Sequence, residues 1–208
     1  MKTQLHLKYS LVIAALCACT SSFGFGFQDI LNWTGTGSNE AGVVIDFHDG
    51  TQYQSFAWGY RWDGTATGES MMDAIGAADP QLLMQIQSYS FGDALETLTF
   101  NGSAAGYGIH TQSGFNTGTP GFWDYYLGNG TSIPSWTESG VGFGGETLSN
   151  QDWNGWSWAA NFNSTPPSDT VYAAPQSVPE PSSVLLPALG IGVGLLLLKK
   201  RRIVGSQV

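Results

Sequence analysis

The residues best suited to acid–base or metal chemistry lie in one short stretch, Asp46 to Asp49, with a further histidine at His110. On a strand, Asp46 and His48 would share one face because they are two positions apart, and Asp49 would begin the next turn. A metal ion would need further ligands, since neither histidine has a partner at a spacing such as His-x-x-x-His. Asp49-Gly50 is itself a common hairpin signal, so a polar turn is the favoured interpretation and no metal site is predicted.

Signatures of several enzyme classes are missing from the sequence. There is no Gly-x-Ser-x-Gly elbow, no Walker loop and no dinucleotide fingerprint. The two cysteines, Cys17 and Cys19, lie in the N-terminal segment, so neither a disulfide nor thiolate chemistry is expected in the main domain. Asp152 to Gly155 is a candidate calcium-binding turn, although the EF-hand pattern is absent. We predict a protein that is not an enzyme and holds no cofactor. A polysaccharide hydrolase is the alternative, because sixteen acidic residues allow many carboxylate pairs.

Eight tryptophans are the other chemical signal. Trp156 and Trp158 share one face of a predicted strand, while Trp153 faces the other side. Exposed indole faces can stack on sugars, so the candidate ligand contacts are Trp58, Trp62, Trp156 and Trp158. The competing and favoured interpretation is that these rings fill the core of a domain without disulfides. Arg61 is predicted to stack between the first two of these rings as a cation–π partner.

Charge is distributed unevenly along the chain. The formal net charge is −9, and Arg61 is the only Lys or Arg between residues 9 and 198. All acidic residues lie between Asp29 and Glu180. Such a domain repels phosphate backbones, so nucleic-acid binding is not expected, and anionic lipid surfaces are poor partners. Divalent cations and neutral polar surfaces such as glycans stay open as ligands.

The N-terminus has the layout of a secretory signal peptide over residues 1–26. Lys2 and Lys8 form a positive region, and the apolar run that follows is too short to span a membrane. Cleavage by signal peptidase is expected between Ala18 and Gly26. Leu16-Cys17-Ala18-Cys19 also resembles a bacterial lipobox with Cys19 as the lipid-bearing residue, so a lipoprotein is the alternative.

The C-terminus combines three features in order. A stiff, non-helical Val178-Pro179-Glu180-Pro181 cluster comes first. An apolar segment follows, for which we predict a transmembrane helix over 182–198; as a helix its core would be about 22 Å long. Four basic residues then stop the segment and keep the tail 199–208 in the cytoplasm, namely Lys199, Lys200, Arg201 and Arg202.

This arrangement resembles the PEP-CTERM sorting signal of Gram-negative bacteria: a Pro-Glu-Pro motif, a transmembrane segment and a basic terminus. The resemblance implies processing by an exosortase, a membrane-embedded cysteine protease or transpeptidase. It also implies export, first to the inner membrane through the C-terminal helix and then to the cell surface or an extracellular biofilm matrix. The same tail occurs on some ice-binding proteins, but a sorting tail does not say what its cargo binds. A simple C-terminal anchor is the alternative.

The segment between leader and tail is predicted to be one extracytoplasmic α+β domain, 27–170, mainly antiparallel β with one principal helix at about 68–79. Thr67 or Ser70 would cap this helix and Pro80 would stop it. Strands are predicted at 43–47, 54–60, 95–100, 122–127 and 153–162, and 82–86 is either a short helix or a strand. The architecture is β-sandwich or β-grasp-like. The order of hairpin, helix and the closing stretch Leu148 to Trp158 is similar to the β-grasp domain that closes transcobalamin-type proteins. Residues 171–181 are expected to be a linker.

The sequence therefore indicates an exported cell-surface or matrix protein whose cargo domain has a binding or structural role. A glycan-binding module that uses tryptophan faces is the first alternative, for which an extracellular polysaccharide is the expected partner. A hydrolase of matrix polymers is the second, and two facing carboxylates in a cleft would favour it.

Overall fold

The computed structural model describes residues 24–90, 92–114 and 120–177. The first of two units in the chain, Met1–Pro175, contains the folded domain, which is mostly β with one α-helix among its described residues. Its elements are η2 Phe27–Asp29, β1 Trp33–Gly35, β2 Asn39–Asp46, β3 Ser55–Trp62, α1 Gly68–Ala78, β4 Leu82–Tyr89, β5 Gly92–Asn101, η3 Ser103–Ala105, β6 Ile109–Ser113, β7 Gly121–Asn129, β8 Thr137–Glu138, β9 Asp152–Ala160 and β10 Tyr172–Ala173.

The larger sheet has seven strands in the order β1-β3-β2-β9-β7-β8, with β10 also paired to β3. The predicted β2–β3 hairpin is confirmed, and Phe47 N donates to Gln54 O at its neck. Mainly antiparallel pairing was predicted, and the larger sheet is mixed: β1 and β10 run parallel to β3, and β2 runs parallel to β9. The parallel pairs join segments that no hairpin connects, for which local alternation gives no information on partner or direction.

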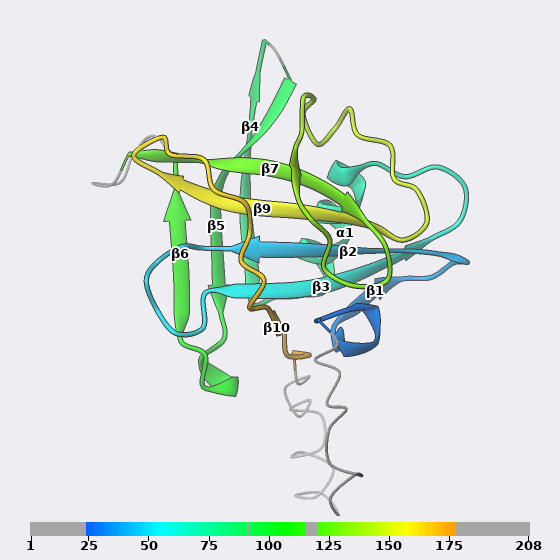
Figure 1. Ribbon diagram of the computed structural model, residues 1–208, viewed down its shortest axis with the longest axis horizontal. Helices are drawn as coiled ribbons and strands as arrows, with labels where there is room; N and C mark the ends of the chain where they lie inside the picture. The colour runs from blue at the N-terminus through cyan, green and yellow to red at the C-terminus, as the bar shows by residue number, and fades with distance from the viewer. Residues whose placement is uncertain (1–23, 91, 115–119, 178–208) are drawn as a thin grey trace, which may run out of the picture. The chain divides into compact units, whose positions relative to one another are not determined.

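The smaller sheet is the antiparallel β4-β5-β6. The open choice at 82–86 is resolved as a strand, since β4 pairs along its length with β5, with one register shift between Gln85 and Ile86. In Figure 1 these three strands run across the direction of β2, β3, β7 and β9. Leu82, Leu98 and Phe100 of this sheet are buried in the same hydrophobic cluster as residues of the larger sheet, so the two sheets share a core.

The predicted helix is confirmed as α1, and Thr67 is its N-cap. Ser70 N donates to Thr67 Oγ1 at 3.2 Å, and Thr67 N donates to Ser70 Oγ at 2.8 Å, which forms a reciprocal capping box. Met71, Met72 and Ile75 form its buried stripe and join the shared core. The helix therefore covers the same face of the larger sheet as the smaller sheet does.

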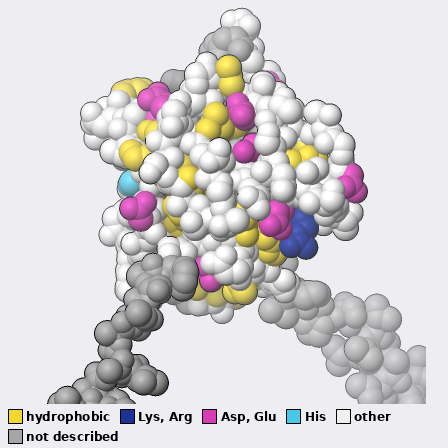
Figure 2. Space-filling model, turned by 45° about the vertical axis from the view of Figure 1, so that its right-hand side comes forward, with side chains coloured by type: hydrophobic (Ala, Val, Ile, Leu, Met, Phe, Trp, Pro, Cys, Tyr) yellow, Lys and Arg dark blue, Asp and Glu magenta, His cyan; other side chains and the backbone are white. Residues whose placement is uncertain are grey.

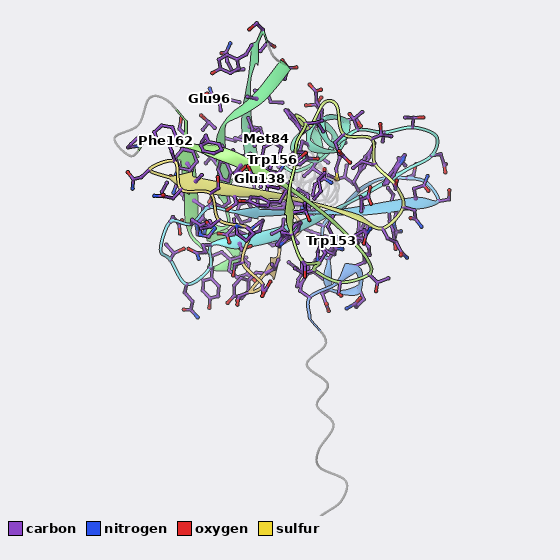
Figure 3. All side chains as sticks on the ribbon, turned by 45° about the horizontal axis from the view of Figure 1, so that its top comes forward. Met84, Glu96, Glu138, Trp153, Trp156 and Phe162 are labelled. Atoms are coloured by element: carbon purple, nitrogen blue, oxygen red, sulfur yellow. The ribbon has the colours of Figure 1, made fainter. Side chains whose placement is uncertain are left out.

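Strand alternation divides the aromatic residues between the two faces of the larger sheet. The inner face, between the sheets, carries Trp58, Trp123 and Trp156. The opposite face carries Trp153, which stacks on Phe27 with ring centroids 4.7 Å apart. Figure 3 labels both Trp153 and Trp156, which come from one strand and belong to different clusters. The prediction that Trp153 faces away from Trp156 and Trp158 is thus confirmed.

Residues 171–181 were predicted to be a linker, but the larger sheet includes two of them as β10. β10 pairs with Phe56 and Ala57 of β3, and Ala174 N donates to Ala57 O. Asn32 Nδ2 donates to Pro175 O at 3.4 Å, so the two ends of the described domain lie side by side. Two residues are too short a strand to show a hydrophobic period.

The predicted transmembrane helix 182–198, the sorting motif and the basic tail lie outside the described residues. Within the described part, no helix has the length and apolar character needed to cross a membrane.

Candidate functional site

The four tryptophans predicted as ligand contacts are all buried. Trp58 is fully enclosed and its Nε1 donates to Asp79 Oδ2 at 2.8 Å. Trp62 stacks on Tyr60 with centroids 5.5 Å apart. Trp158 lies edge-on to another indole, that of Trp123. These rings do not form an exposed stacking platform on the described surface, and Trp156 borders a pocket described below.

Arg61 does not lie between Trp58 and Trp62. Its guanidinium lies 4.5 Å from the ring centroid of Trp33 and 3.3 Å from Glu40 Oε2. The reason is strand alternation: Trp58 and Trp62 point into the core from β3, whereas Arg61 points to the other face. In Figure 2 a single basic side chain is visible on a face that carries several acidic ones.

The two histidines form two separate pairs instead of one metal centre. His48 Nε2 lies 3.6 Å from Asp46 Oδ2, and His110 Nδ1 lies 2.6 Å from Asp49 Oδ2. His110 is buried, and its Nε2 lies 2.9 Å from Tyr107 O. Burial would raise the pKa of Asp49, but hydrogen bonds from Thr51 and His110 outweigh it and hold the pKa below its usual value. The Asp49–His110 pair ties the β2–β3 turn to β6, whereas the Asp46–His48 pair is local to the end of β2.

The candidate calcium turn is a strand. Asp152 to Gly155 opens β9, where neighbouring side chains point to opposite faces. Asp152 accepts a hydrogen bond from Ser149 N, and Asn154 Oδ1 accepts one from the Tyr125 hydroxyl. Among the described residues no three His, Cys, Asp or Glu side chains group in a way that would hold a metal ion.

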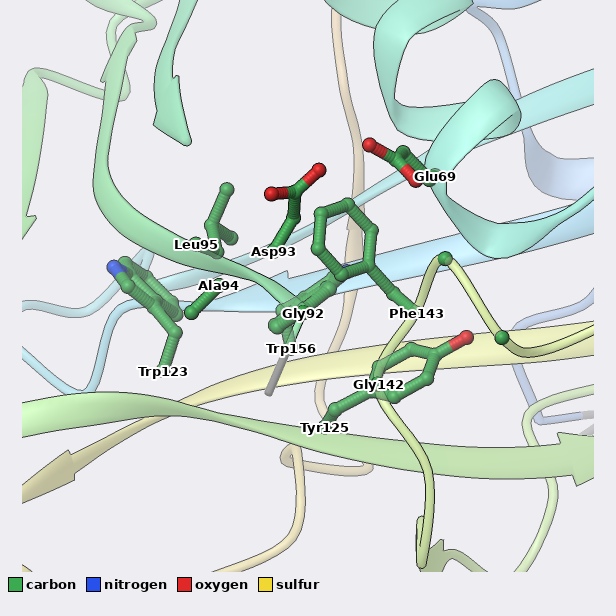
Figure 4. Close-up of a pocket in the computed structure, with 12 residues that line it drawn as sticks. Glu69, Gly92, Asp93, Ala94, Leu95, Trp123, Tyr125, Gly142, Phe143 and Trp156 are labelled. Carbon is green, nitrogen blue, oxygen red and sulfur yellow. The ribbon is translucent and has the colours of Figure 1, made fainter. Parts of the chain in front are cut away.

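A pocket of about 580 Å³ lies where the start of α1, the start of β5 and the inner face of β7 and β9 meet. Figure 4 shows Glu69 of α1 and Asp93 of β5 at its mouth, with their carboxyl groups turned toward each other. Its wall is apolar and largely aromatic, formed by Leu95, Trp123, Tyr125, Phe143 and Trp156. This volume is typical of sites for small molecules.

The aromatic wall is held rigidly by its own contacts. Tyr125 stacks on Trp156 at 4.6 Å between centroids, and Phe143 meets the same indole edge-on at 5.3 Å. Burial raises the pKa of the Tyr125 hydroxyl, which therefore stays neutral and donates to Asn154. The indole N–H groups of Trp123 and Trp156 have no hydrogen-bond partner among the described residues.

The loop 142–146 closes the pocket against the first turn of α1. Gly68 N donates to Glu146 O at 3.0 Å, and Glu69 N donates to Phe143 O at 3.1 Å. Glycine is required at the close approach of Gly68, where a Cβ would lie 2.6 Å from the Tyr125 hydroxyl and 3.0 Å from Phe143 O. Because the loop and the Thr67 cap use the first backbone N–H groups of the helix, these groups are not free to bind an anion.

The pKa of Glu69, at the mouth of the pocket, is raised above its usual value. Burial raises the pKa of Glu69, and the neighbouring Asp93, which hydrogen-bonds to it, raises the pKa further together with the charge of Asp73. Burial also raises the pKa of Glu146, on the adjoining loop, with a further contribution from Asp152. Negative charge is therefore held close together at this mouth with no Lys or Arg of the described domain to neutralise it.

Nothing in the sequence distinguishes Glu69 or Asp93 from the other acidic residues. Two carboxylates on different elements show no spacing signal, because their distance depends on how β5 packs beside α1. Trp156 is the one predicted contact residue that the structure places at the pocket. Comparisons with protein-family models, with curated proteins and with solved structures give no match to this chain.

Proposed function

We propose that the chain is an exported cell-surface or matrix protein and that its folded domain binds an extracellular glycan in the pocket between α1, β5 and β9. The pocket carries this proposal: an apolar, aromatic wall next to two hydrogen-bonding carboxyl groups is the chemistry that recognises a sugar ring. The ring's C–H faces would pack on the wall, and its hydroxyls would donate to Glu69 and Asp93.

Binding is favoured over hydrolysis of the glycan. A glycosidase needs its two carboxyl groups roughly 5–5.5 Å apart when it retains configuration and about 6.5–9.5 Å apart when it inverts. Glu69 and Asp93 instead lie beside each other with their carboxyl groups turned toward one another, so the pair does not flank an open space from two sides. The raised pKa of Glu69 is an attribute of a general acid, but the geometry argues for a ligand-binding pair.

A pocket-filling variant tests the binding proposal. Ala94 borders the pocket, so Ala94→Trp should place an indole in it and abolish binding of the full chain to a glycan array. Gln85→Trp, an exposed change on the neighbouring strand β4, is the matched control and should leave binding unaltered. Binding that survives Ala94→Trp in a protein with an unchanged melting temperature would rule out this pocket as the glycan site.

Sorting through the C-terminal signal is proposed on the sequence alone. The sorting motif Val178 to Pro181 follows the last fixed residues of the domain within a few positions, so it would lie between the domain and the predicted membrane segment. Changing Pro179, Glu180 and Pro181 to Ala should leave export intact and block C-terminal trimming, as read by mass spectrometry of the protein recovered from cells. An intact Val208 terminus in the wild-type protein from cells with an exosortase would sink the sorting proposal.

We also propose that the domain is β-sandwich-like rather than β-grasp-like. Support comes from the shared core between the two sheets, to which both the larger sheet and the smaller sheet contribute buried residues. A β-grasp domain packs its helix against a single sheet, whereas here a second sheet covers the same face as α1.

A further inference from the structure

We infer that the pocket selects an amine-bearing sugar unit, such as a glucosamine residue of a deacetylated polysaccharide, over its neutral or N-acetylated equivalent. This inference rests on the proposed function, because it names the ligand class of the same site. It starts from the two carboxyl groups at the pocket mouth, Glu69 and Asp93 (Figure 4).

The first argument is that these carboxyl groups lack a counter-charge from the protein. Arg61 is the only Lys or Arg among the described residues, and it is already held by Glu40 and by the ring of Trp33. Both histidines are likewise paired elsewhere, with Asp46 and Asp49. Like charges placed close together disfavour ionisation, and an ammonium group placed beside the two carboxyl groups would offset this repulsion.

The second argument excludes the opposite charge. A phosphate, sulfate or uronic acid at the start of α1 would need free backbone N–H groups or a basic side chain. The first-turn N–H groups of Gly68, Glu69 and Ser70 donate instead to Glu146 O, Phe143 O and Thr67 Oγ1. An anionic glycan would therefore meet the carboxyl groups of Glu69 and Asp93 at this mouth without a basic side chain of the described residues to offset them.

The third argument is the apolar surface of the pocket, which lies next to the two carboxyl groups. Leu95, Trp123 and Phe143 give an apolar surface next to the carboxyl pair, which suits a ring with a C–H face beside its amine. A bare metal ion would not use this surface, and the described residues supply no third carboxylate or histidine grouped with the pair to hold one. The recognised unit is thus a cation attached to a ring.

The experiment is calorimetric titration of the full chain, in neutral detergent at low salt, with short glucosamine oligomers and with the same oligomers N-acetylated. Glucosamine oligomers should bind at least about tenfold more tightly, since one lost charge-assisted hydrogen bond weakens binding by roughly ten- to a hundredfold. Glu69→Gln and Asp93→Asn should each remove this preference. Glu138→Gln takes one charge from the exposed strand β8 and should retain it. Affinity should fall on acidification, because protons then compete for Glu69.

The outcomes separate this inference from the proposed function. Equal affinity for both oligomers, unchanged by Glu69→Gln, would leave glycan binding standing and overturn the amine preference. No binding to these oligomers or to any glycan on the array would overturn both. Equal competition by a simple diamine, or displacement by calcium at constant ionic strength, would show a general cation site and overturn the sugar assignment.

Discussion

Two pairs of side chains in this domain show how the same charged group can serve structure or ligand binding. Asp49 meets His110 at 2.6 Å, and His110 is almost completely buried. Glu69 meets only another carboxyl group, that of Asp93, at the open mouth of a pocket. The pKa of Asp49 is held down by its hydrogen-bond donors, whereas the pKa of Glu69 is raised by burial and by its acidic neighbour.

The difference separates a pair whose polar groups are satisfied within the domain from a pair that a bound ligand would satisfy. Both ring nitrogens of His110 are engaged: Nδ1 lies 2.6 Å from Asp49 Oδ2, and Nε2 lies 2.9 Å from Tyr107 O. The Glu69–Asp93 pair consists of two carboxyl groups, with no Lys or Arg of the described residues paired to either. We therefore expect changes to the first pair to lower stability, and changes to the second to lower ligand binding with little effect on stability.

The largest expected effect lies in the aromatic core behind both pairs. Trp158→Ala should lower the free energy of unfolding by about 3–5 kcal/mol, because this indole is buried between the sheets and no disulfide is present among the described residues to compensate. Phe162→Ala removes a ring that is 61% exposed and should change the free energy of unfolding by less than about 0.5 kcal/mol. Thermal unfolding measures both, and similar melting temperatures for the two variants would contradict the buried position of Trp158.

The next effect tests the structural pair directly. His110→Gln should lower the free energy of unfolding by about 2–3 kcal/mol, somewhat below the usual 3–5 for a fully buried pair, because Asp49 is partly exposed. His48→Gln is the matched control: its contact to Asp46 is longer, at 3.6 Å, and its side chain is 27% exposed, so the loss should stay below about 1 kcal/mol. Urea unfolding measures both variants. Equal losses in the free energy of unfolding would contradict the distinction between the buried Asp49–His110 pair and the more exposed Asp46–His48 pair.

The elements that were predictable have local signals. A few neighbouring residues predict the α1 cap at Thr67 and the end of the helix before Pro80. The Asp49-Gly50 turn of the β2–β3 hairpin is also predicted by its own residues. The alternation that separates Trp153 from Trp156 is local as well. These features depend on backbone preferences within one element, so sequence periodicity reports them.

The rest depends on contacts between distant segments. The parallel pairing of β2 with β9 brings Ile45 beside Trp156, and the side chain that stacks on Arg61 comes from β1 rather than from its own strand. The pocket mouth needs α1 and β5 to meet, so Glu69 and Asp93 had no distinguishing pattern. The tryptophans were the strongest sequence signal. Because large aromatic rings dominate the energetics of burial, most of these tryptophans lie inside the core.

The smallest expected effect concerns the pH dependence of stability, and it separates the two pairs by sign. The pKa of Glu69 in the folded domain is raised above its usual 4.5, as is that of Glu146 on the adjoining loop. Between 4.5 and the folded value, the folded state holds a proton that the unfolded chain has lost, so the stability contributed by the protonated carboxyl is lost as the pH rises through this window. The melting temperature should therefore increase when the pH is lowered from neutral toward about 4.5.

Asp49 acts in the opposite direction and at lower pH. Its folded pKa lies below 3.8, so its contribution is present above that value and is lost only as the pH falls further. Glu69→Gln should flatten the upper slope and raise stability at neutral pH slightly, by no more than about 0.5 kcal/mol, as is usual for a partly exposed position. Glu138→Gln should keep the wild-type slope, since Glu138 is exposed on β8. A melting temperature that falls steadily from neutral pH to 4.5, or a slope that Glu69→Gln leaves unchanged, would mean that the carboxyl pair at the pocket mouth is not under mutual strain and has no need of a cationic ligand.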